Sequence, residues 1–353
     1  MKVAWLRPAL TGEERDFLLE MLSAKITVQS APPLPLSVEA RRPGAASLPA
    51  TEEVLACVRD ADVIVGSRFT AEILSAAARA RVVVVPFAGP ADAELALLRQ
   101  YGQWTVCNSH YNAPFVAEHA IALLLAAAKR LLPYDRALRQ GRWRAERGAA
   151  ASMTLAGKTM TVLGYGAIGS RIVTLARGFG MRLIVIRRNV SAGEPRDAAF
   201  VGTVDDLEQI LPETDCLMVC VPLTDETRGL LGERHWRLMK RSALVVNVSR
   251  GEVLEEGALF RALETGEIAG AGIDAWYHYP ADDEALQLPS ELPFHTLHNV
   301  VMSPHRAGDT DERTRAQITD VAQQLNRIAD GEEPSNVLWK ASSAGTAPRS
   351  GLD

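Results

Sequence analysis

Three short segments place an arginine, an aspartate and a histidine where they could act together. They are N-V-S-R-G at 247–251, G-I-D at 272–274 and S-P-H-R-A-G at 303–308. Each follows a short apolar run of strand length. Because ligands of open α/β sheets bind at the carboxyl ends of strands, we expect Arg250, Asp274 and His305 to share one sheet edge. Arginine and histidine together suit an anionic substrate and a proton transfer.

Each of these residues also has an ordinary structural role open to it. A strand-end arginine can be a solvated charge, an aspartate after a strand often caps a turn, and a loop histidine can bond backbone groups. Taken singly, the structural roles are favoured. Their joint occurrence along one predicted sheet edge favours a functional site.

The element expected to organise this edge is the stretch Leu155–Asn189. An apolar run leads into Gly164, Gly166 and Gly169, and a helical pattern then precedes a second apolar run. A lone G-x-G-x-x-G is weak evidence, but between a strand and a helix it predicts a dinucleotide-binding turn. The glycines allow a tight turn, a close approach of pyrophosphate and close packing of the helix. The N–H groups at the helix start would face the phosphates.

Strand and helix patterns alternate along the whole chain, which indicates an α/β fold with parallel sheets covered on both faces. Before the glycine turn, strands are expected at 3–6, 26–29, 62–66 and 82–87, and helices at 11–23, 52–58 and 71–80. After it, strands are expected at 217–221, 243–248, 270–273 and 300–303, and helices at 235–239, 254–265 and 310–329. The sequence therefore predicts two doubly wound units, of which the second binds the dinucleotide.

A long alanine- and leucine-rich helix is expected at Pro114–Leu132, before the glycine turn. Its apolar residues cover more than one face, which predicts burial between domains or in a dimer interface. Glu118 and His119 interrupt it, and buried hydrogen bonds are favoured over a catalytic role for either.

Composition excludes several classes of function. The 353 residues carry a net charge of −5 without a strong basic block, so no nucleic-acid partner is expected. The apolar run near 121–128 is well short of the ~20 residues that cross a bilayer, so no membrane partner is expected. The four cysteines lack ligand or C-x-x-C spacing, which favours buried thiols in a cytoplasmic protein and no metal site.

Six motifs in a fixed order resemble the D-isomer-specific 2-hydroxyacid dehydrogenases over nearly the whole chain. They are V-A-E-H-A-I-A-L-L-L-A from Val116, L-A-G-K-T-M-T-V-L-G-Y-G-A-I-G from Leu155, P-L-T-D-E-T-R-G-L from Pro222, N-V-S-R-G from Asn247, A-G-A-G-I-D from Ala269 and M-S-P-H-R-A-G from Met302. The resemblance implies two Rossmann- or flavodoxin-like domains with the active site in the cleft between them. It implies a discontinuous substrate domain at 1–107 plus 307–340, a dinucleotide domain at 108–306 and dimerisation through the helix at 114–132. The small, polar tail at 341–353 is expected to be disordered.

The resemblance also implies roles for single residues. Arg250 would bind the substrate carboxylate and the reacting oxygen, and His305 would be the general acid in reduction and the base in oxidation. Ala88 and Gly89 would hold the carboxylate through backbone N–H groups. Arg68 could meet a second anionic group, and a surface arginine is an equally good interpretation. The implied cofactor contacts are Gly164, Gly166, Ala167, Ile168, Gly169, Arg187, Arg188, Val221, Pro222, Thr227, Val248, Asp274, His305 and Gly308.

One departure from the family pattern concerns the histidine. The family places a glutamate five residues after the strand-end aspartate, where it pairs with the histidine, and this chain has Tyr279 there. Asp282, Asp283 or Glu284 could substitute, within an unusually long insert between Pro280 and Pro293. Without a carboxylate partner the charged form of His305 loses support, so reduction should weaken at lower pH than in relatives that keep the glutamate.

A second departure concerns the cofactor. Members that use NAD carry an acidic residue at the end of the second strand, where it binds the ribose 2′-hydroxyl. This chain has Arg187 and Arg188 there, which would pair with a 2′-phosphate. We therefore expect NADP, with NAD still possible if both arginines are merely solvated.

The function predicted is NAD(P)H-dependent reduction of a small 2-oxo acid to a D-2-hydroxy acid. Glyoxylate, hydroxypyruvate or an acid with a further anionic group, such as a phosphonate, are the candidate substrates. The alternative is a dinucleotide-sensing protein without catalysis, which Tyr279 keeps open and which Arg250 and His305 oppose. A methyltransferase, which also uses a glycine-rich turn, is disfavoured by the arginine, aspartate and histidine segments that follow.

Overall fold

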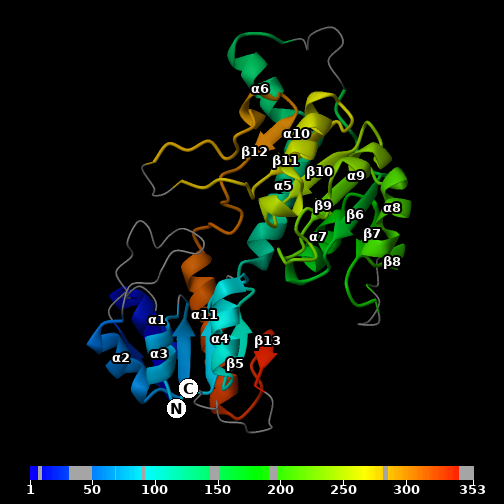
Figure 1. The fold of residues 1–353 in the computed structure, drawn as a ribbon. Coiled ribbons are helices and arrows are strands. Elements are labelled where there is room, and N and C mark those ends of the chain that lie inside the picture. Colours follow the sequence, from blue (N-terminus) through cyan, green and yellow to red (C-terminus); the bar gives the residue numbers. More distant parts are fainter. Residues whose placement is uncertain are drawn as a thin grey trace. The chain divides into compact units, whose positions relative to one another are not determined.

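Two sheets, each with its own core, divide the chain into two units. The computed structural model describes residues 1–6, 10–31, 50–67, 69–89, 92–143, 151–190, 195, 198–280 and 285–341. Unit 1 comprises Met1–Asn112 and Asp311–Asp353, and unit 2 comprises Ala113–Thr310 (Figure 1). Unit 1 is therefore discontinuous in sequence.

Unit 1 is a six-stranded sheet in the order β13-β5-β4-β3-β1-β2. Its strands are β1 Lys2–Leu6, β2 Thr27–Ser30, β3 Val63–Gly66, β4 Val82–Val85, β5 Thr105–Asn108 and β13 Val337–Lys340. Its helices are α1 Gly12–Met21, α2 Glu52–Arg59, α3 Ala71–Ala76, α4 Asp92–Tyr101 and α11 Arg313–Ala329. The five parallel strands follow the flavodoxin-like order 2-1-3-4-5. The sixth, β13, is antiparallel to β5, and the sequence patterns predicted neither of these two strands.

Alternating residues of the parallel strands build a core on each face of this sheet. On one face, Val3 and Trp5 pack with Ile318 and Leu325 of α11. On the other face, Ala4 and its neighbours pack with α2 and α3. Strands buried on both faces are what their continuous apolar sequences predict.

Unit 2 is a seven-stranded sheet in the order β12-β11-β10-β9-β6-β7-β8. Its strands are β6 Thr159–Leu163, β7 Arg182–Ile186, β8 Phe200–Gly202, β9 Cys216–Val219, β10 Leu244–Asn247, β11 Gly270–Ile273 and β12 Val300–Met302. Its helices are α5 Ala113–Ala128, α6 Leu131–Arg139, α7 Ala167–Arg177, α8 Leu207–Ile210, α9 Glu233–Leu238 and α10 Glu256–Glu264. All pairings are parallel, and the order reverses beside β6 as in a Rossmann fold. The α/β class with two doubly wound sheets is confirmed.

The helix expected at 114–132 is present as α5, but it ends four residues early, and a second helix begins at Leu131. Helix α5 ends at Ala128, and α6 begins at Leu131 after Arg130, whose φ of 53° is left-handed. A left-handed residue cannot continue an α-helix, so the chain changes direction there. Helix α5 buries Ala120 and Leu124 in the core of unit 2, whereas α6 buries none of its residues.

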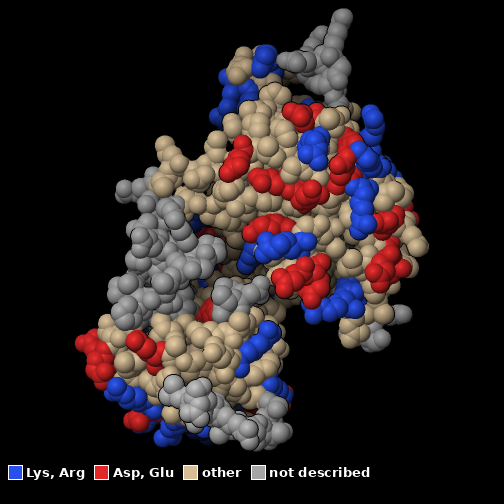
Figure 2. Space-filling view, viewed as in Figure 1, with Lys and Arg blue, Asp and Glu red and all other residues tan. Residues whose placement is uncertain are grey.

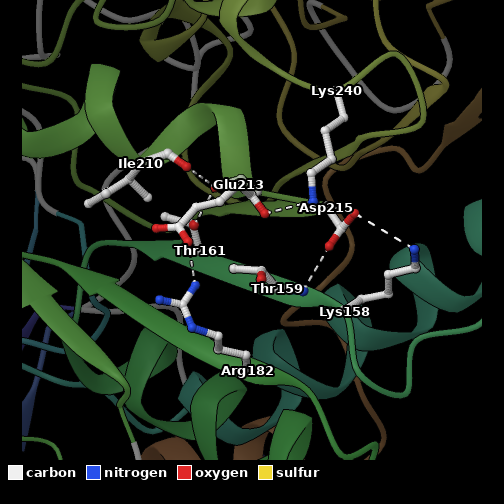
Figure 3. Close-up of polar contacts among 9 residues, drawn as sticks. Lys158, Thr159, Thr161, Arg182, Ile210, Glu213, Asp215 and Lys240 are labelled. Atoms are coloured by element: carbon white, nitrogen blue, oxygen red, sulfur yellow. Dashed lines mark hydrogen bonds and ion pairs between the residues drawn. The ribbon is translucent and has the colours of Figure 1, made fainter.

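A charged cluster stabilises the unit 2 sheet at the end where its strands begin (Figure 3). Asp215 is buried and accepts hydrogen bonds from the N–H of Thr159 (2.9 Å) and from Nζ of Lys240 (2.9 Å). Nζ of Lys158 lies 3.9 Å from the same carboxylate. The cluster joins the starts of β6 and β9, away from the edge that carries the candidate site.

Candidate active site

The glycine turn between β6 and α7 has the geometry that close backbone packing requires. Gly164 has a φ of 102°, and a Cβ there would lie 2.8 Å from the carbonyl carbon of Cys220. A Cβ on Gly169 would lie 1.9 Å from the carbonyl oxygen of Gly164, so only glycine fits either position.

The start of α7 offers an anion-binding position beside this turn. Gly166 is the N-cap residue, it supplies no side-chain cap, and the space where its Cβ would lie is open. The first N–H groups of the helix, which include those of Ala167 and Ile168, are thus left for a ligand such as a pyrophosphate. The residues of this turn fit the pyrophosphate of a dinucleotide such as NAD or NADP.

Two arginines follow β7 directly, at the same edge of the sheet. Arg187 is half-buried, its Nη2 donates to the carbonyl of Val190 (2.9 Å), and its guanidinium lies 5.8 Å from the ring centroid of Tyr165. Arg188 is exposed. The hydroxyl of Thr224 and, more weakly, the charge of Arg188 lower the pKa of Glu226 in the loop after β9.

The segment after β10 is held by the buried side chain of Asn247. Its Oδ1 accepts from the N–H (3.0 Å) and the hydroxyl (2.9 Å) of Ser249, and its Nδ2 donates to the carbonyl of Arg250 (2.9 Å). Arg250 is half-buried, and its Nη1 donates to the carbonyl of Ser249 (2.7 Å). The asparagine therefore fixes the backbone that carries the arginine.

Asp274 follows β11 and holds the turn after β12. The residue is only 1% exposed. Its Oδ1 accepts from the hydroxyl of Ser303 (2.6 Å) and the N–H of Arg306 (3.0 Å), and its Oδ2 accepts from the N–H of Ala307 (3.1 Å). A carboxylate has about four acceptor sites, so one remains for a further donor.

His305 lies inside that turn, with a left-handed φ of 58°. Its side chain stays accessible to solvent. Desolvation by the surrounding protein and then the positive charge of Arg250 lower the pKa of His305, and the charge of Asp274 opposes them. The arginine and the histidine are thus close enough to interact.

Tyr279 lies against His305. The two ring centroids are 5.4 Å apart and the planes are tilted by 48°. The Tyr279 hydroxyl accepts a hydrogen bond from the N–H of Trp276 (3.0 Å). Tyr279 is 47% exposed, and partial desolvation raises its pKa, so it stays neutral. The candidate replacements Asp282, Asp283 and Glu284 lie outside the described residues.

The other expected positions divide between the two units. Val221, Pro222, Thr227, Val248 and Gly308 follow strands β9, β10 and β12 of unit 2. The Thr227 hydroxyl donates to the carbonyl of Pro222 (2.7 Å), which closes a local turn. Ala88 and Gly89 follow β4 in unit 1, where the Ala88 carbonyl accepts from Nδ2 of Asn108 (2.7 Å). Arg68 and the tail at 342–353 lie outside the described residues.

Three residues of this site were not predicted from the sequence. Ser303, Trp276 and Asn247 all fix the backbone around the expected residues. His119 of α5 makes the expected internal hydrogen bond, in which its Nε2 lies 2.9 Å from Oγ of Ser303. Its position within an apolar helix was the signal, but the partner could not be read from the sequence.

Among the described residues, no three His, Cys, Asp or Glu side chains gather in a way that could hold a metal ion. None of the helices in the described ranges combines the length and apolar character that crossing a membrane requires. On the face drawn in Figure 2, basic and acidic side chains are interspersed over unit 2.

Comparison with known proteins agrees with this geometry. Residues 121–307 match the model of the D-isomer specific 2-hydroxyacid dehydrogenase, NAD binding domain. A glyoxylate reductase of Korarchaeum cryptofilum is 33% identical over 82% of this chain and 86% of that protein. A D-3-phosphoglycerate dehydrogenase of Methanocaldococcus jannaschii is 32% identical over 81% of this chain, which spans only 53% of that protein.

Solved structures share the fold over 96% of this chain. The D-lactate dehydrogenase of Lactobacillus jensenii, solved with NAD⁺, superposes with a TM-score of 0.73 at 21% identity, over 96% of this chain and 100% of that one. An acyclic imino acid reductase in complex with NADPH and D-Arg superposes with a TM-score of 0.72 at 22% identity, with the same coverage.

Together with the family match, the two-unit α/β fold and the dinucleotide turn identify a nicotinamide-dependent oxidoreductase. The chain belongs to the D-isomer-specific 2-hydroxyacid dehydrogenase family.

Proposed function

We propose that this protein reduces a small 2-oxo acid to the D-2-hydroxy acid, with His305 as general acid and Arg250 as the group that binds the carboxylate. When bound, the nicotinamide dinucleotide supplies the hydride. Gly164, Gly166 and Gly169 would hold its pyrophosphate. The observation that carries the proposal is that Arg250 and His305 follow β10 and β12 at the same end of the sheet, with β11 and its Asp274 between them.

Arg250 would bind the substrate, and His305 would transfer the proton. The guanidinium of Arg250 keeps its charge and can bind a carboxylate in two parallel hydrogen bonds. His305 would donate a proton to the substrate oxygen as the carbonyl is reduced, and would accept it again in the reverse direction. Asp274 has one acceptor position left for the carboxamide of the cofactor.

We further propose NADP as the preferred cofactor, because Arg187 and Arg188 supply positive charge after β7 where a 2′-phosphate would lie.

We also propose a homodimer. The support is α6, where Leu131 is 53% and Leu138 50% exposed. A cytoplasmic location is proposed from the free cysteines, Cys57, Cys107, Cys216 and Cys220.

The experiment is to follow NADPH and NADH oxidation with glyoxylate, hydroxypyruvate and larger or phosphonate-bearing 2-oxo acids. Turnover that falls at least about 100-fold in both His305→Ala and Arg250→Ala supports the assignment. Binding of NADPH without oxidation across the whole panel would favour the alternative, a dinucleotide-sensing protein. The observation that favours this alternative is Tyr279, which lies against His305 where the family pattern has a glutamate.

A further inference from the structure

We propose that Asp274, Ser303 and His119 form a positioning network that fixes the backbone of the His305 turn and so presents the imidazole for proton transfer. The inference rests on the proposed function, because it takes His305 as the general acid. None of the three residues needs to touch the substrate in this role.

The turn needs support because His305 is left-handed. A φ of 58° is unfavourable for a residue with a Cβ, and such residues persist where their surroundings hold them. The next two N–H groups, of Arg306 and Ala307, both point to the carboxylate of Asp274, at 3.0 and 3.1 Å. Successive N–H groups next to a left-handed residue form a cradle for an anion, and here the anion is a buried side chain of the same unit.

The start of the turn is fixed by Ser303. Its N–H donates to the carbonyl of Ile273 (2.9 Å), and its carbonyl accepts from Nε1 of Trp276 (2.8 Å). Its hydroxyl donates to Oδ1 of Asp274 (2.6 Å). The carboxylate therefore joins both ends of the segment that contains His305.

His119 completes the network from a different element. Because the Ser303 hydroxyl donates to Asp274, its oxygen accepts from Nε2–H of His119 (2.9 Å), which places a proton on Nε2 of that histidine. The same Nε2 lies 3.6 Å from Oδ1 of Asp274.

Helix α5, which carries His119, packs closely on the sheet of unit 2. Leu123, one turn further along α5, packs so closely on β11 that a Cβ on Gly272 would lie 2.8 Å from the Leu123 Cβ. Residues four apart share a helix face, so His119 and Leu123 both point to this sheet. The packing of α5 on β11 therefore fixes the position of His119.

A double-mutant cycle with His305 tests this role. We expect Ser303→Ala to lower kcat about tenfold, since a small displacement of a catalytic group costs that much or more, while NADPH affinity, followed by its fluorescence, is retained. Ser303→Thr keeps the hydroxyl and should restore most of the rate. In a His305→Ala background, Ser303→Ala should cause no further loss, because the network acts through the imidazole.

His119 provides an independent pair of variants. His119→Gln keeps an N–H donor and should retain more activity than His119→Leu, and this pair serves if Ser303→Ala does not fold. An equal loss in Ser303→Ala and Ser303→Thr, or an undiminished effect of Ser303→Ala without His305, would overturn the inference. A His305→Ala variant with normal kcat would instead overturn the proposed function, so the two failures are distinguishable.

Discussion

Tyr279 packs its ring against His305, with 5.4 Å between the ring centroids, at the position where the family pattern places a glutamate. The tyrosine is neutral and its hydroxyl already accepts from the N–H of Trp276. The histidine thus has an aromatic neighbour in place of a carboxylate. Nothing at this position opposes the lowering of its pKa by desolvation and by Arg250.

The pH dependence of reduction should reflect this pairing. Reduction needs the protonated imidazole, so kcat/KM falls as the pH rises through the pKa of His305. Because that pKa is lowered, the fall should be centred below the ordinary histidine value of about 6.5. Tyr279→Glu adds a negative charge, which should raise the pKa and move the fall to higher pH.

The matched control is Tyr279→Gln, which has the same shape as the glutamate variant without its charge. It should leave the midpoint of the pH profile near that of the unsubstituted enzyme. Identical profiles for the glutamate and glutamine variants would show that charge at this position does not reach His305.

Replacing both Arg187 and Arg188 by alanine should change the choice of cofactor. Each lost charge-assisted hydrogen bond is worth about 1.5–3 kcal/mol, so kcat/KM with NADPH should fall by at least about tenfold and with NADH much less. Arg182→Ala, at the other end of β7 and paired with Glu213, is the control and should leave the ratio unchanged. An unaltered ratio in the double variant would refute the assignment to a 2′-phosphate.

The exposed apolar residues of α6 predict where a second copy binds. Leu131→Glu with Leu138→Glu should shift a dimer to monomer, because two charges would be buried without partners. Leu175 of α7 is also partly exposed, so Leu175→Glu serves as the control that leaves the mass unchanged. Light scattering during gel filtration gives the answer, and a dimer that survives the double substitution must use another surface.

The Asp215 cluster predicts a dependence of stability on acid. Burial acts to raise the pKa of Asp215, but the N–H of Thr159 and the charges of Lys240 and Lys158 outweigh it, so the pKa is lowered. Its contribution is therefore present above about pH 4, the ordinary carboxyl value, and is lost as the pH falls through the lowered pKa.

Asp215→Asn should consequently destabilise the protein at neutral pH by about 1–3 kcal/mol, the cost of hydrogen bonds to a buried charged group. Both lysines are partly exposed and can regain water, which keeps the cost in this range. Calorimetry should show that the difference in Tm shrinks in acid. A difference that stays constant down to about pH 3 would mean that the carboxylate charge is not the stabilising feature.

Sequence patterns were sufficient for the parts of the fold that depend on local rules. The glycine turn could be placed because its geometry allows only glycine at Gly164 and Gly169, and buried strands could be placed from continuous apolar runs. The break at Arg130 could not, because a left-handed residue that is not glycine leaves no mark in an apolar helical pattern. Strand β13 was also missed, since its pairing with β5 depends on residues far away in sequence.

The candidate site shows the same division. Arg250, Asp274 and His305 were recognisable because each follows a strand. Their supporting contacts were not, because Ser303 meets Asp274 and His119 only after β11, β12 and α5 are packed. Tyr279 could be recognised in the sequence as a departure from the family pattern, but the contact of its ring with His305 could not be derived from spacing.

Because unit 1 consists of two separate segments of the chain, it can be completed only late in synthesis. Its core requires Ile318 and Leu325 of α11, and its sheet edge at β5 is paired by β13. On the ribosome, these segments emerge only after the whole of unit 2 has been synthesised. Unit 2 can therefore fold first, while the N-terminal sheet still lacks the helix that covers one face and the strand that pairs its edge. Exposed apolar surface and unpaired strand edges of this kind favour aggregation.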